Sequence, residues 1–115
     1  MKKFLSILML IGVSSSIVFA ANGGFKDTIS PKKASVSEIL KMNNNSYVSV
    51  QGNIVKRISD DKYSFKDTTG TITVEIDDDK WGGVNAGTQD KLELVGEVEK
   101  KYNSTELDVD SVRKL

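Results

Sequence analysis

The stretch from Tyr63 to Asp77, YSFKDTTGTITVEID, limits the possible folds of this chain more than any other segment. Apolar and polar residues alternate on both sides of a short polar break, as they do in two strands that each bury one face. The break, Asp67 to Gly70, supplies a carboxylate that can accept backbone hydrogen bonds and a glycine that can turn the chain. The segment therefore predicts a β-hairpin, with Gly70 at positive φ and Asp67 capping the turn rather than acting as a catalytic acid.

The N-terminus has the pattern of an export signal. Two lysines precede an apolar run from Phe4 to Val13, and the residues up to Ala20 fit the small-residue rule for cleavage. We expect residues 1–20 to be a signal peptide, cleaved after Ala20 or Ala21, with a retained membrane anchor as the alternative. No later segment is apolar enough to span a bilayer. Because the signal carries two basic and no acidic residues, its removal would change the formal charge from 0 to −2.

The sequence contains neither cysteine nor histidine. Without cysteine there is no disulfide and no thiolate ligand, so the fold depends on its core and its β-ladder. Without histidine the commonest general base and metal ligand is missing, and an enzyme would have to use other groups. A hydrolase with paired carboxylates, for which Asp77 and Glu97 are the first candidates, is the alternative to a binding protein.

The rest of the chain divides into an extended lead-in at residues 21–34 and a single domain at residues 35–115. Ser35-Val36-Ser37-Glu38 matches a capping box and predicts a short helix from about Val36 to Met42. Further strands are expected at residues 47–58, at residues 91–99 and around Leu107 and Val109. The loss of alternation after Gly52 predicts a bulge or a bend in the first of these.

Five short antiparallel strands with interior glycines predict an all-β fold with a small α contribution. The expected architecture is a closed or nearly closed five-stranded barrel with one short N-terminal helix. Ile39 and Leu40 of that helix are expected to pack on one end of the barrel, since so short a helix is marginal alone. The alternation assigns one set of side chains to the barrel core: Val50, Ile54, Phe65, Ile72, Val74, Leu94 and Val98.

Several segments occur together along the mature chain: GNIVK at Gly52 to Lys56, the hairpin itself, Trp81, and GEVEKK at Gly96 to Lys101. In this combination the sequence resembles the bacterial OB-fold (BOF) family, small periplasmic proteins of the YgiW/YdeI stress-tolerance type. The resemblance implies an OB barrel that lacks the usual helix between its third and fourth strands, and a periplasmic binding module without a cofactor. In that family the fourth-strand segment usually reads GEVDKD. Here it reads GEVEKK at Gly96 to Lys101, so its local charge differs.

The outer face of the hairpin lacks the residues that bind single-stranded nucleic acid. OB barrels that bind nucleic acid use aromatic and basic side chains on their second and third strands. The outward positions here carry no aromatic residue: Lys62, Ser64, Lys66, Thr71, Thr73, Glu75 and Asp77. With a mature charge of −2 from the same count, nucleic acid is not expected as a partner.

Asp77, Asp78 and Asp79 form the densest charge run and are weak candidates for a metal site. The run does not fit an EF-hand loop, because Trp81 and Thr88 stand where the fifth and twelfth oxygen ligands belong. A solvated turn that ends the strand is the favoured interpretation. Trp81 is expected to close one end of the barrel, with a stacking platform for a sugar or peptide ring as the alternative.

Two rows of acidic residues are the main candidates for ligand binding. Glu93, Glu97 and Glu99 share the outward side of the fourth strand, and Asp108 and Asp110 share that of the fifth, together with Glu106. We expect both rows to lie near the first strand, because that strand is expected to pair with the fifth and also to meet the fourth. A small cationic ligand, such as a peptide, a polyamine or a divalent metal, would relieve their repulsion. An ordinary solubilising surface is the alternative for these rows. The alternative function is an envelope scaffold that binds proteins through a strand edge. The sequence does not indicate an oligomeric state.

Overall fold

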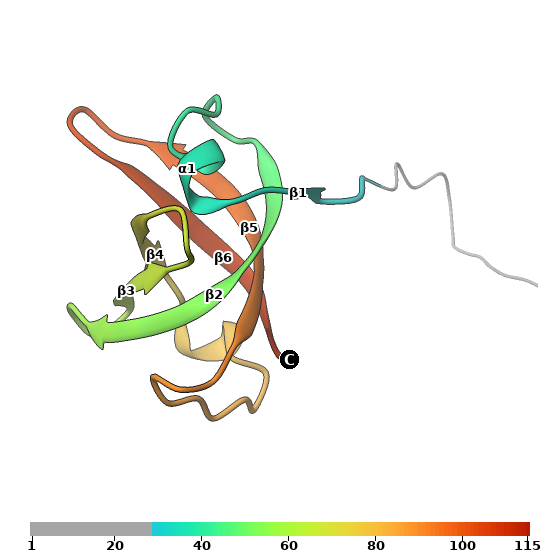
Figure 1. The fold of residues 1–115 in the computed structure, drawn as a ribbon, viewed down its shortest axis with the longest axis vertical. Coiled ribbons are helices and arrows are strands. Elements are labelled where there is room, and N and C mark those ends of the chain that lie inside the picture. The colour runs from blue at the N-terminus through green and yellow to red at the C-terminus, as the bar shows by residue number, and fades with distance from the viewer. Residues whose placement is uncertain (1–28) are drawn as a thin grey trace, which may run out of the picture.

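The computed structural model describes residues 29–115, which fold into one small β-barrel (Figure 1). The predicted signal, residues 1–20, and the first part of the predicted lead-in lie outside the described residues. The elements in chain order are β1 (Lys32–Lys33), α1 (Val36–Ile39), β2 (Tyr47–Arg57), β3 (Lys62–Lys66), β4 (Thr71–Glu75), the 3₁₀ helix η2 (Asp78–Lys80), β5 (Leu92–Lys100) and β6 (Thr105–Lys114).

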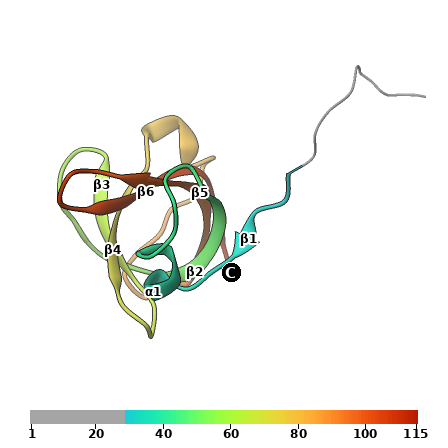
Figure 2. The ribbon, with the colours of Figure 1, turned by 90° about the horizontal axis from the view of Figure 1, so that it is seen from above.

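The strands follow the order β1-β2-β3-β4-β6-β5, and an additional pairing of β2 with β5 closes the barrel. Seen from above, β2 to β6 surround a common axis (Figure 2). This confirms the predicted all-β, five-stranded OB barrel with one short helix. The chain adds a two-residue strand, β1, which pairs in parallel with β2.

One predicted pairing is wrong. The last strand, β6, does not pair with β2 but lies between β4, to which it is parallel, and β5, to which it is antiparallel. The pairing of β2 with β5 agrees with the expectation. The error arose because parallel pairing between strands far apart in the sequence leaves no local pattern.

Strand β2 serves two neighbours because it bends. Its first half pairs with β5 and its second half with β3, with a register shift between Ile54 and Lys56. The predicted irregularity after Gly52 is confirmed at this shift. A Cβ atom on Gly52 would collide with the Lys66 carbonyl oxygen, so the close crossing of β2 and β3 requires glycine there.

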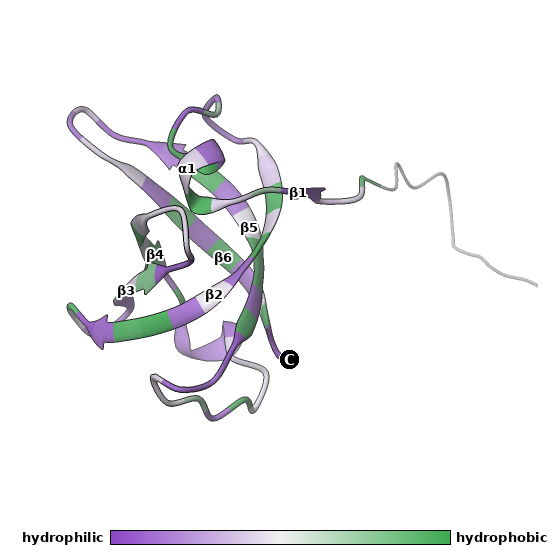
Figure 3. Ribbon diagram, in the orientation of Figure 1, coloured by the Kyte–Doolittle hydropathy of each residue, from purple (hydrophilic) through white to green (hydrophobic). Residues whose placement is uncertain are grey.

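The core agrees with the predicted alternation with two exceptions. Apolar and polar positions alternate along the strands (Figure 3). Of the seven predicted barrel positions, all except Ile54 and Ile72 are at most 1% exposed. Ile72 is 3% exposed, and Ile54 is only partly buried. The second exception is Leu40, which is 40% exposed instead of packed. The other buried apolar residues are Val36, Ile39, Val48, Tyr63, Ile76, Leu92, Leu107 and Val109.

Leu40 is exposed because α1 is shorter than predicted. The helix ends at Ile39, and the chain then tightens, with the Lys41 N–H bonded to the Glu38 carbonyl at 3.0 Å. Bonds from residue i to i−3 rotate the chain relative to an α-helix, which moves Leu40 away from the barrel. Val36 and Ile39 therefore form the buried face of α1, and both are fully buried.

The hairpin turn is held by the Asp67 carboxylate. Its Oδ1 accepts hydrogen bonds from the backbone N–H groups of Thr69 at 2.7 Å and Gly70 at 3.1 Å. The predicted turn-capping role of Asp67 is thereby confirmed. The predicted positive φ of Gly70 is wrong, because among the described glycines only Gly82 and Gly83 have positive φ. The side chain of Asp67 closes the turn, so no left-handed residue is needed.

The same turn caps the N-terminus of α1. The Val36 N–H donates to Asp67 Oδ2 at 2.9 Å, and the Ser37 N–H donates to Thr69 Oγ1 at 3.0 Å. The third N–H of the helix, that of Glu38, donates to the capping residue Ser35 at 3.2 Å. Side-chain oxygens therefore satisfy the first three N–H groups of α1, and two of these oxygens come from the hairpin.

The first prediction concerns Asp67. Replacing Asp67 by Ala removes acceptors from both the turn and the helix, and should lower the free energy of unfolding by ~2 kcal/mol in denaturant titrations. Burial alone would raise the pKa of Asp67, but hydrogen bonds from Thr69, Val36 and Gly70 outweigh it and lower that pKa below 3.8. The stabilisation is thus present at neutral pH and lost as the pH falls through the lowered pKa. Asp79→Ala, at an exposed position, is the control; equal losses would contradict this role.

The second prediction compares two identical substitutions. Leu94→Ala empties a fully buried core position and should cost about 2–5 kcal/mol of stability. Leu40→Ala removes the same atoms at a site that is 40% exposed and should cost less than ~1 kcal/mol. Urea unfolding of both variants measures the difference. A Leu40→Ala cost as large as that of Leu94→Ala would contradict the exposed position of Leu40.

Candidate functional site

Three carboxylates lie side by side across the outer surface of β4, β6 and β5. Glu75 of β4 is opposite Asp108 of β6 in the parallel ladder, and Asp108 is opposite Glu97 of β5 in the antiparallel ladder. A second row lies two residues further along β5 and β6, where Glu106 of β6 is opposite Glu99 of β5. We call these five residues the acidic face.

Two lysines compensate part of this charge. Lys62 Nζ lies 3.2 Å from Glu106 Oε1 and donates a hydrogen bond to Oε2 at 3.4 Å. This hydrogen bond and the charge of Glu106 raise the pKa of Lys62. Lys101 Nζ lies 3.8 Å from Glu99 and 3.9 Å from Glu106. All three ion pairs therefore involve the second row of the acidic face.

The first row remains electrostatically strained. Burial raises the pKa of Glu75 above its ordinary value of 4.5, and Lys62 only partly opposes the added effect of three carboxylates: Asp61, Asp108 and Asp77. Burial likewise raises the pKa of Asp108 above 3.8, reinforced by four carboxylates: Glu99, Asp110, Asp77 and Glu97. In both groups burial is the largest cause and the neighbouring carboxylates add to it, because burial and like charge each disfavour the charged form.

Glu75 belongs to two groups of carboxylates with the spacing of a metal site. Its carboxylate oxygen and those of Asp61 and Asp77 lie within 4.8 Å of one another, and the same is true of Glu75, Glu99 and Glu106. Hard divalent cations bind such sets of carboxylate oxygens, and Ca²⁺ accepts irregular arrangements more readily than Mg²⁺. The geometry therefore permits cation binding at or beside Glu75.

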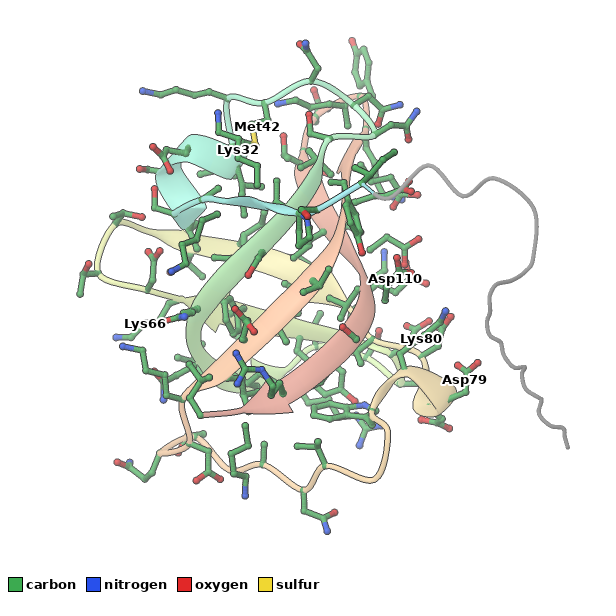
Figure 4. The ribbon with its side chains drawn as sticks, turned by 90° about the vertical axis from the view of Figure 1, so that its right-hand side faces the viewer. Lys32, Met42, Lys66, Asp79, Lys80 and Asp110 are labelled. Atoms are coloured by element: carbon green, nitrogen blue, oxygen red, sulfur yellow. The ribbon has the colours of Figure 1, made fainter. Side chains whose placement is uncertain are left out.

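The predicted ligand residues are divided by the structure. Glu97, Glu99 and Asp108 lie in the acidic face, while Asp110 lies beyond it and pairs with Lys80 at 3.8 Å (Figure 4). Glu93 is separate, since its carboxylate is held by Arg113 Nη2 at 2.6 Å and by the Ser49 hydroxyl at 3.0 Å. The hydrogen bonds from Arg113 and Ser49 lower the pKa of Glu93.

Glu75, a central residue of the acidic face, was not among the candidate ligand residues, whereas Glu106 was placed in one of the two candidate rows. Glu75 was assigned to the outward side of the hairpin, and Glu106 to the outward row of the last strand, but nothing in the sequence joined them. Only the parallel pairing of β4 with β6 brings them together. Of the aspartate run, Asp77 joins Asp61 and Glu75, whereas Asp78 and Asp79 begin η2.

Trp81 directly follows η2, the short helix that lies at the end of the barrel opposite α1 in Figure 1, and it packs against the core. Its ring meets the Tyr63 ring edge to face, with centroids 5.6 Å apart and planes at 87°, and it lies partly buried against the core. The Arg57 guanidinium lies 5.7 Å from the centre of the Tyr63 ring. These contacts are those expected of a residue that closes the barrel, and Trp81 takes no part in the acidic face.

The fold and its surface define the class of protein. A closed barrel of this strand order is an OB fold, an architecture that commonly carries binding surfaces. Within residues 29–115, no helix is long and apolar enough to cross a membrane.

The chain belongs to the bacterial OB-fold family. The family model described as "Bacterial OB fold (BOF) protein" matches residues 12–114. Protein YgiW of Escherichia coli (strain K12) is 38% identical over 128 aligned positions, covering 100% of this chain and 98% of YgiW. The calcium-regulated OB-fold protein CarO of Pseudomonas aeruginosa is 34% identical over 110 positions, covering 96% of this chain and 94% of CarO. The solved structure of YgiW from E. coli matches with a TM-score of 0.70 and 43% identity, over 82% of this chain and 100% of that chain.

The third prediction follows from the raised pKa values. A group whose pKa is higher in the folded state binds protons more tightly there, so stability falls as the pH rises through that pKa. Glu75→Gln should therefore raise the melting temperature at pH 7, by an amount equivalent to no more than ~1 kcal/mol for so accessible a group. The gain should shrink as the pH falls toward the ordinary value of 4.5. Glu93→Gln, at a carboxylate whose pKa is lowered, should instead reduce stability at pH 7; the same sign for both would contradict the electrostatic assignment.

Proposed function

We propose that this protein is an exported periplasmic binding module of the envelope stress-tolerance type, and that its acidic face binds a cationic ligand. Export is supported by the signal pattern of residues 1–20, and the periplasmic stress role by membership of the bacterial OB-fold family. The proposed role is binding and not catalysis, since the chain has no histidine or cysteine to act as base or nucleophile.

The observation that carries the proposal is the row Glu75, Asp108 and Glu97. Like charges placed directly opposite each other in a ladder are destabilising, and here the repulsion extends across three strands. A bound cation would remove that repulsion and gain Coulomb energy, with a strong dependence on salt. The neighbouring carboxylates also add to the effect of burial in raising the pKa values of Glu75 and Asp108, which agrees with this repulsion.

Ca²⁺ is the first ligand to consider. Within each of the two groups that contain Glu75, the carboxylate oxygens lie within 4.8 Å of one another and match the hard-oxygen preference of this ion. The relative CarO is named a calcium-regulated OB-fold protein, which gives a second reason to begin with calcium. An organic polycation such as a polyamine or a basic peptide would use the same charges with less geometric demand.

The second candidate function is binding of a protein in the cell envelope. The two-residue strand β1 forms the start of the sheet order and has one neighbour, β2, so a short sheet edge lies there. An extended segment of a partner could add to such an edge through backbone hydrogen bonds. The edge is only two residues long, so we favour the acidic face.

The fourth prediction tests the acidic face directly. Calorimetric titration of the protein with CaCl₂ should show saturable binding at low ionic strength, weakened at about 150 mM salt because the carboxylates are accessible. Glu75→Gln should weaken binding about five- to tenfold, since Glu75 belongs to both carboxylate groups.

Asp79→Asn is the matched control, because it removes one negative charge at an exposed residue of η2 outside these groups. Titrations with spermidine and with an oligolysine peptide test the organic polycations. Binding of these but not of Ca²⁺ would assign the face to an organic ligand. Absence of saturable binding by all three, or equal effects of Glu75→Gln and Asp79→Asn, would refute the proposal.

A further inference from the structure

A second concave surface carries the opposite charge. It is a groove of about 630 Å³ bordered by β1, the bent strand β2 and the β3–β4 turn. Three lysines line it, Lys33 from β1, Lys66 from the end of β3 and Lys91 just before β5, and we call it the basic groove. Figure 4 shows Lys66 on the side of the barrel away from Asp110.

The lysines of the basic groove are free of ion pairs within residues 29–115. The bases with a carboxylate partner in this range lie elsewhere: Lys62, Lys80, Lys101, Arg113 and Lys114. Lys33, Lys66 and Lys91 are exposed and come from three separate segments: β1, β3 and the loop before β5. Their ammonium groups therefore keep their full capacity to pair with an anion that enters the groove.

The acids that border the groove are already used by the fold. The Asp67 carboxylate accepts backbone hydrogen bonds from Thr69, Gly70 and Val36. The Glu38 carboxylate accepts from the Ser35 N–H at 2.9 Å in the capping box. Both carboxylates are committed to donors of the backbone, so a lysine that turned to pair with them would have to compete with capping bonds.

The floor of the groove is polar and fixed. The Asn53 amide donates to the carbonyl oxygens of Thr88 at 3.2 Å and Asp90 at 2.9 Å, which ties β2 to the loop before β5. The Ser49 hydroxyl is bound to Glu93. Polar side chains of Gln51 and Thr68 complete the lining. Such a floor offers hydrogen-bonding groups to an oxygen-rich ligand.

We propose that the basic groove binds a small polyvalent oxyanion, a molecule that carries two or more carboxylate or phosphate groups. Three ammonium groups on separate segments exceed what one monovalent anion can contact, whereas a polyvalent anion can pair with several at once. Lysine presents a mobile point charge and not the planar fork of arginine, so the groove suits anions of varied geometry. This site lies apart from the acidic face and does not depend on the function proposed for it.

The fifth prediction tests this site in calcium-free buffer, because polyvalent oxyanions chelate Ca²⁺. Titration with inorganic tripolyphosphate and, separately, with citrate should show saturable binding of at least one probe at low salt, weaker at about 150 mM salt. Lys33→Gln with Lys66→Gln should reduce the affinity about three- to tenfold, as expected for the loss of two accessible charge pairs. Binding of only one probe would identify phosphate or carboxylate as the source of the shared oxyanion chemistry.

Lys32→Gln with Lys41→Gln is the control, because it removes the same net charge at exposed lysines that do not line the groove. NMR shift changes on titration should centre on the amides of Gln51, Gly52 and Thr68. Equal loss of affinity in both double variants would mean diffuse attraction to the whole surface and would overturn the proposal. So would shifts centred elsewhere, or the absence of saturable binding by both probes.

Discussion

The carboxylate of Asp67 joins three parts of this fold. It closes the β3–β4 turn through Thr69 and Gly70, and it caps α1 through the Val36 N–H. A four-residue helix cannot persist in water by itself, so α1 depends on this cap and on the burial of Val36 and Ile39. The same carboxylate borders the basic groove, whose wall it holds in place while it is too fully bonded to neutralise the lysines.

Properties set by neighbouring residues could be predicted from the sequence. The hairpin, the capping box, the inward positions of Phe65 and Val74 and the irregularity of β2 each follow from a pattern a few residues long. The wrong predictions for Leu40 and Gly70 also concern local structure. They depend on hydrogen bonds that the alternation of apolar and polar residues does not encode. Leu40 is displaced by a tightened helix end, and Gly70 needs no positive φ because Asp67 closes its turn.

The candidate site could be predicted only in part, because it is made by pairing between distant strands. Outward parity identified Glu97, Glu99 and Asp108, yet the parallel pairing of β4 with β6 decides that Glu75 stands beside them. The antiparallel pairing of Glu93 with Arg113 has the opposite effect. Their close ion pair occupies the Glu93 carboxylate, so Glu93 is not part of the acidic face. Single-sequence patterns fix which face a side chain occupies, and the strand order fixes its neighbours on that face.

Acidic and basic side chains lie on different surfaces of this barrel, so they cannot fully neutralise one another. The acidic face lies on β4, β6 and β5, and the basic groove lies between β1, β2 and the β3–β4 turn, with the apolar core between the walls. Lys62 and Lys101 neutralise the row of Glu99 and Glu106, but the row of Glu75, Asp108 and Glu97 keeps its repulsion. Because the cost of repulsion between accessible groups is small, the fold tolerates it without any ligand. Stability alone therefore does not require either surface to bind anything, and the decisive property is whether each surface selects ions by geometry and not only by charge.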